Sequence, residues 1–77
     1  MPEFITRMEN ELKELEERIS KLSKFIKSDI FKYDISCEKQ DLMNEQLGVM
    51  IHYQRLLKQR LEIEHAEYYE AKRYNNG

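Results

Sequence analysis

The sequence predicts an all-α fold: a two-helix antiparallel hairpin of coiled-coil type, a single domain that assembles into a homo-oligomeric helical bundle. Charged residues make up 36% of the 77 residues, while Gly and Pro number only 2 and 1. This composition is typical of long helices and provides too few turn residues for a sheet protein. Apolar residues recur at helical spacing. Because so short a chain buries little apolar surface alone, we expect oligomerisation to stabilise it.

The first helix is expected from about residue 3 to residue 28, after the only proline, Pro2. Its apolar residues are separated by three and four positions in alternation, which is the a/d seam of a coiled coil. The seam consists of Ile5, Met8, Leu12, Leu15, Ile19, Leu22 and Ile26. This helix therefore presents one continuous apolar stripe to a partner helix.

A turn is expected at about residues 29–36, where the seam pattern ends and Ser and Asp favour caps over helix interiors. Ser36 is a candidate N-cap for the second helix. That helix is expected over about residues 37–70, followed by a frayed tail at residues 71–77. At 1.5 Å per residue it overhangs the first helix by about two turns.

The second helix carries a wide apolar face, on an arc of about 160°, with a polar row along its middle. We name this row, which consists of Gln46, Tyr53 and Arg60, the polar line. Each polar group buried without a partner costs about 1–3 kcal/mol, and a charged one costs more. We therefore expect the polar line to find partners, with Arg60 near Glu9 and Glu11 of the first helix.

Two interpretations of the polar line remain open. Buried polar residues in helical bundles can fix the register and the oligomeric state. Alternatively the line forms a ligand pocket between protomers, in which Arg60 binds an anion, Tyr53 stacks and Gln46 forms hydrogen bonds. Lys24 and Lys27, at the basic turn end of the first helix, would attract phosphate to it. These lysines also complement the helix dipole, which is a purely structural explanation of their position.

Aromatic residues at both ends of the hairpin suggest an alternative function. Phe31 and Tyr33 lie in the turn, and Tyr68 and Tyr69 lie on the overhang of the second helix. If exposed, they would form apolar patches through which the chain docks on another protein.

The composition argues against several classes of protein. The net charge of −2 lacks the basic excess of a general nucleic-acid binder. No apolar run approaches the roughly 20 residues that cross a membrane. The single cysteine, Cys37, excludes an intramolecular disulfide and fits the reducing cytoplasm. The sequence contains no nucleophile–base pair and no glycine-rich phosphate loop, so we expect no enzyme, no metal site and no cofactor.

The chain resembles a family of short phage proteins related to a crAss-like phage protein, over about residues 4–63. The most specific residues in this resemblance are Phe25, Ile26, Gln46, Met50, Tyr53 and Arg60. It implies a phage-encoded protein that acts in the bacterial cytoplasm and counters host defence. Some helical-hairpin oligomers do so by sequestering nucleotide immune signals between protomers, which is an analogy at the level of the fold. We therefore predict an anti-defence sponge for a nucleotide signal.

Overall fold

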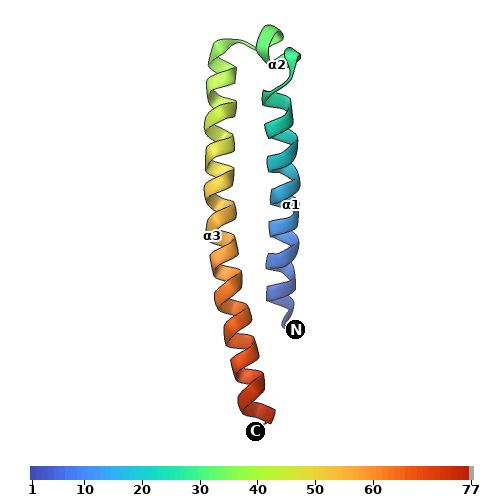
Figure 1. The fold of residues 1–77 in the computed structure, drawn as a ribbon, viewed down its shortest axis with the longest axis vertical. Coiled ribbons are helices and arrows are strands. Elements are labelled where there is room, and N and C mark those ends of the chain that lie inside the picture. Colours follow the sequence, from blue (N-terminus) through green and yellow to red (C-terminus); the bar gives the residue numbers. More distant parts are fainter. Residues whose placement is uncertain (77) are drawn as a thin grey trace.

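The computed structural model describes the backbone of residues 1–76 and the side chains of residues 1–72. Helices hold 92% of the described residues, and no strand occurs among them. The order is α1 (Glu3–Ile26), α2 (Asp29–Asp34) and α3 (Cys37–Asn76). Figure 1 shows α1 and α3 side by side and antiparallel, with α2 at the closed end and the C-terminal part of α3 extending past the N-terminus.

The core lies on the seam between α1 and α3. Ile5 and Leu57 are 1% and 0% exposed, and Met8 and Leu61 complete the buried cluster, with Leu12 packed against it. The seam predicted for the first helix thus faces α3. On α3, buried or half-buried side chains recur at alternating intervals of four and three residues along the contact. They include Met43, Leu47, Met50, Gln54, Leu57 and Leu61. Each helix therefore contributes a heptad stripe to the contact.

The closed end contains a short helix, α2, where the sequence predicted a turn. Ser28 forms its N-cap, since the hydroxyl accepts a hydrogen bond from the Phe31 amide at 3.2 Å. The side chain of Phe31 is buried and meets the ring of Phe25 edge-on, with centroids 6.0 Å apart. Ser36 caps α3 as predicted, accepting from the Lys39 amide at 3.4 Å.

Gln40 ties the closed end together. Its Nε2 donates to the carbonyl oxygens of Phe31 and Ile35, both at 2.8 Å, and lies 3.5 Å from that of Lys32. These carbonyls belong to the C-terminal part of α2 and its cap, which have no partners within so short a helix. One amide on α3 thus satisfies them and fixes α2 against α3.

The helix ends differ from the prediction at two places. The first helix ends at Ile26, because Lys27 and Ser28 form the turn that caps α2. The second helix continues to Asn76, beyond the predicted end near residue 70. Neither Gly nor Pro interrupts residues 71–76, so nothing in that sequence terminates the helix. The helix α3 therefore extends over the predicted tail as far as Asn76, while the fraying itself stays a prediction, and Gly77 lies outside the described residues.

Candidate functional site

The polar line lies at one edge of the α1–α3 contact and not in its interior. The columns of α3 that face α1 contain Leu57 and Leu61, whereas Tyr53 is 38% exposed and Gln46 and Arg60 are exposed. The expectation that these groups are buried within the chain is wrong. The reason is geometric: α1 covers only part of the apolar arc, and the polar line falls about 60° beyond it on the helical wheel.

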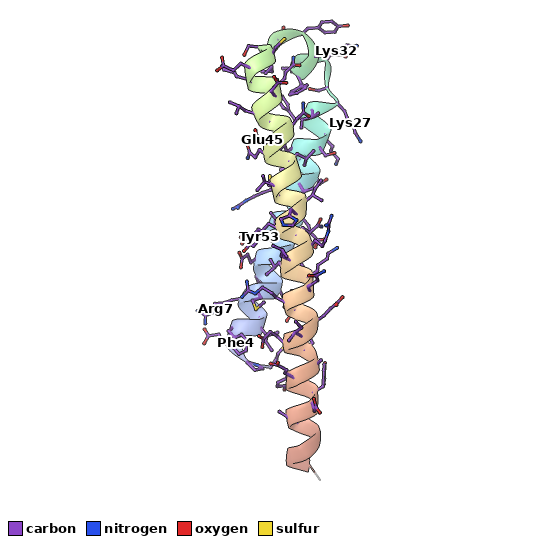
Figure 2. All side chains as sticks on the ribbon, turned by 90° about the vertical axis from the view of Figure 1, so that its left-hand side faces the viewer. Phe4, Arg7, Lys27, Lys32, Glu45 and Tyr53 are labelled. Atoms are coloured by element: carbon purple, nitrogen blue, oxygen red, sulfur yellow. The ribbon has the colours of Figure 1, made fainter. Side chains whose placement is uncertain are left out.

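Tyr53 forms the one side-chain contact described between the polar line and α1. Its hydroxyl donates a hydrogen bond to the Glu11 carboxylate. Figure 2 shows Tyr53 on the same side of the hairpin as Phe4 and opposite to Lys27. This contact fixes the register of the edge, with Glu11 level with Tyr53.

The pKa of Tyr53 is shifted by the charged residues around it. The hydrogen bond to Glu11 raises the pKa of the phenol above its ordinary range, and partial burial and the charge of Glu11 add to the effect. The positive charge of Arg60 acts in the opposite direction and lowers this pKa. Arg60 is therefore close enough to Tyr53 to act on it, so Glu11, Tyr53 and Arg60 form one electrostatic cluster.

The register adds a residue that the sequence interpretation missed. Arg18 follows Glu11 by one heptad and shares its face of α1, as Gln46 precedes Tyr53 by one heptad on α3. Arg18 is thus level with Gln46 on the same edge, and it is exposed. The heptad position of Arg18 could have revealed this placement once Glu11 was paired with Tyr53.

Lys24 and Lys27 do not join this edge within one chain. Lys24 is level with Gln40, about 30 Å along α3 from Arg60 at 1.5 Å per residue. Lys27 projects at the closed end, on the side opposite to Tyr53 (Figure 2). The expectation that these lysines assist Arg60 is therefore not met in the single chain, because the hairpin is too long.

The four aromatic residues of the alternative function do not form one surface. Phe31, a residue of α2, is buried, which corrects its assignment as a docking residue. Tyr33 is 74% exposed at the closed end, with the Lys32 ammonium 5.5 Å from its ring centroid. Tyr68 packs on the core, and Tyr69 is 60% exposed at the other end of a molecule 63 Å long.

A hollow runs along the opposite edge of the α1–α3 contact from the polar line. It is an open groove of about 370 Å³ with Leu12 and Leu61 among its lining residues. The polar residues at its rim are Glu9, Lys13, Glu16, Lys58, Glu62 and His65. Lys58 lies 3.6 Å from Glu16, and His65 lies 3.8 Å from Glu9. With three carboxylates at its rim, this groove is a poor site for an anion.

A comparison with protein families shows which family the chain belongs to. The family model described as Sequestin matches residues 2–63, which is most of the chain. The chain belongs to the Sequestin family. The match contains all of α1 and α2, and the part of α3 that bears the polar line, whereas Tyr68 and Tyr69 lie outside it. No curated protein and no solved structure matches this Sequestin-family chain.

Two further observations concern the described residues of this Sequestin-family protein. None of the three helices carries an apolar stretch that could cross a lipid bilayer, within the part of the chain described. Across the same residues, no three His, Cys, Asp or Glu side chains gather closely enough to hold a metal ion.

The phenol of Tyr53 is expected to ionise at a higher pH than an ordinary tyrosine. Because its folded-state pKa is raised, the stabilisation from the Glu11 hydrogen bond is complete below the unfolded value of about 10. It is lost as the pH rises through the folded-state pKa. Alkaline titration followed by tyrosinate absorbance should show a late component, which Tyr53→Phe removes.

The matched control is Tyr33→Phe, which removes an exposed tyrosine of the closed end. This variant should leave the late component of the titration in place. Identical titration curves for the two variants would contradict the Tyr53–Glu11 contact.

Proposed function

We propose that the chain is a non-enzymatic, homo-oligomeric binding protein that sequesters an anionic, nucleotide-type signal. Its phage origin, its role against host defence and its action in the bacterial cytoplasm belong to the same proposal and rest on the resemblance to short phage proteins. The name of the Sequestin family is consistent with sequestration. We infer the ligand and the oligomer from the polar line.

The observation that carries the proposal is the cluster of Tyr53, Arg60 and Glu11 at an exposed edge of the hairpin. The Tyr53 ring is held by Glu11 and has a face on which a base can stack, a contact worth about 1–3 kcal/mol. Arg60 beside it supplies a permanent charge and planar donors that suit phosphate oxygens. Gln46 adds donors and an acceptor one heptad away.

Binding without reaction belongs to the same proposal. Catalytic acids, bases and nucleophiles usually depend on burial and close charges to shift their pKa values. Sequestration requires only affinity, which exposed arginines and aromatic rings can supply once a pocket closes around the ligand.

The test is to purify the protein from bacteria that express a nucleotide-signalling defence system, denature it, and identify the released small molecules by mass spectrometry. The wild type should release a nucleotide. Arg60→Gln should lower the amount by about tenfold or more, since a charge-assisted contact to phosphate is worth roughly 1.5–3 kcal/mol.

The matched control is Arg55→Gln, an equal loss of charge on the same helix but on the face turned away from the polar line. Arg55→Gln should release as much nucleotide as the wild type. Equal losses in the two variants, with both folded, would contradict a site at Arg60. A wild type that releases no nucleotide would contradict the proposed ligand class.

Docking on a host or phage protein is less well supported. Phe31 is buried, and Tyr33 and Tyr69 belong to α2 and to the C-terminal part of α3, which lie at opposite ends of the hairpin (Figure 1). If the purified wild type carried no small molecule but a stoichiometric protein instead, this second function would replace the first.

A further inference from the structure

A row of exposed apolar side chains runs along α3 and has no partner within the described part of the chain. Its members are exposed by 61%, 64%, 44% and 57% and follow one another at intervals of one heptad: Leu42, Val49, Leu56 and Ile63. Residues at this interval lie on one face of a helix. We name the row the apolar ridge. It lies next to the polar line, on the side away from α1.

The size of the surface indicates what covers the ridge. The chain exposes 6299 Å², whereas a compact monomer of this mass exposes about 5,000 Å². The excess exceeds the roughly 800 Å² that each partner contributes to a standard interface. Among the residues whose side chains are described, only six hydrophobic ones are buried in the single chain. A second copy offers the same ridge and would enlarge this small core.

We propose that two copies pair antiparallel through the apolar ridge, with the two-fold axis level with Tyr53. The ridge is symmetric about this level: Leu42 then lies opposite the partner's Ile63, and Val49 opposite the partner's Leu56. Two-fold symmetry brings identical flanks together, so the polar lines of both copies lie along one side of the pair. The contact between the copies is thus made by α3 alone.

Charge supports this register. On the flank of the polar line, one heptad beyond its ends, lie Lys39 and Glu67. The pairing places Lys39 level with the partner's Glu67 at both ends of the interface. Arg60 is level with the partner's Gln46, and Tyr53 is level with the partner's Tyr53. Among these residues of α3 no like charges meet, whereas like charges would oppose association.

The pairing also completes the proposed site, a step that rests on the proposed function. In one chain Arg60 and Arg18 are two heptads apart along the edge. In the pair, Arg60 of one copy is level with Gln46 and Arg18 of the other. Two equivalent sites result, each with arginines from both copies, an arrangement suited to a phosphate group. The site is incomplete without the second copy.

The test exchanges the charges at the ends of the interface. Lys39→Glu and Glu67→Lys should each weaken self-association by about tenfold, since two like-charged pairs replace two opposite ones. When the two variants are mixed, with one isotope-labelled, complementary charges are restored only in the heterodimer. Native mass spectrometry should then find more heterodimer than random assortment gives. Random assortment would overturn the proposed register.

A second variant tests the ridge itself. Leu56→Glu should convert the dimer to a monomer of unchanged helicity, because Leu56 is not part of the hairpin core. Ile51→Glu, at a residue 41% exposed but outside the ridge, should remain dimeric. A wild type that is monomeric, or a dimer retained in Leu56→Glu, would overturn the proposal. These measurements use ligand-free protein and are independent of the nucleotide test. A dimer confirmed here, together with no nucleotide in that test, would refute the proposed function and leave the pairing intact.

Discussion

Leu57→Ala is expected to lower the free energy of unfolding by about 2–5 kcal/mol, the range for deleting a buried leucine side chain. Leu57 is 0% exposed and lies in the cluster that joins α1 to α3. A chain of this length has a total stability of only about 4–12 kcal/mol. The substitution thus removes a large share of it. Thermal melting followed by circular dichroism measures the loss at fixed protein concentration.

Ile51→Ala is the matched control, since it shortens a side chain on the same helix that is 41% exposed. Its cost should be near the roughly 0.5 kcal/mol typical of surface substitutions. If Ile51→Ala cost as much as Leu57→Ala, the α1–α3 seam would have a different register from the one described.

Gln40→Glu is expected to be the most damaging change at the closed end, with a cost of about 1–3 kcal/mol. The substitution replaces the Nε2 donor by an oxygen that carries negative charge. That oxygen would face the carbonyls of Phe31 and Ile35, each now 2.8 Å from Nε2. Repulsion should release α2, and the melting temperature should fall by about 4–8 °C for each kcal/mol.

Asn44→Asp provides the control for Gln40→Glu. It makes the same change from amide to carboxylate one turn further along α3, at an exposed position. The effect on the melting temperature should be small. Faster amide hydrogen exchange in α2 of the Gln40 variant, absent from the Asn44 variant, would locate the damage. Equal exchange in both would show that Gln40 does not hold α2.

The first helix was predictable because its pattern is unambiguous. A single stripe of apolar residues at alternating spacings of three and four can face only one partner, and Ile5, Met8 and Leu15 are indeed buried. The second helix has three apolar columns, and α1 covers two of them. Periodicity does not say which column is left exposed, and this is why the polar line was expected in the interior.

Contacts between distant residues were harder to predict. A contact between Glu11 and the polar line followed from the antiparallel hairpin, although the residue that makes it is Tyr53 and not Arg60. The role of Gln40 did not, because it depends on carbonyl positions that only the folded α2 creates. The helix α2 was itself missed, since its six residues are too few to show a period and are rich in residues typical of turns.

The pairing of α3 gives the exposed ridge and the exposed polar line a common explanation. In the single chain the apolar ridge is an apolar surface exposed to water, and the polar line is a site that does not enclose a ligand. In the antiparallel pair the ridge is covered, and Arg60 of each copy lies level with Arg18 and Gln46 of the other. The charge of the site then comes from both copies.

The central claim is that two copies together hold an anionic nucleotide-type ligand. Native mass spectrometry of wild-type protein purified from bacteria with an active nucleotide-signalling defence tests it most directly. The account predicts a dimer, or a multiple of it, with nucleotide-sized additional mass up to two per dimer. A monomer that carries the ligand by itself would contradict the shared site, and an oligomer with no additional mass would contradict sequestration of such a ligand.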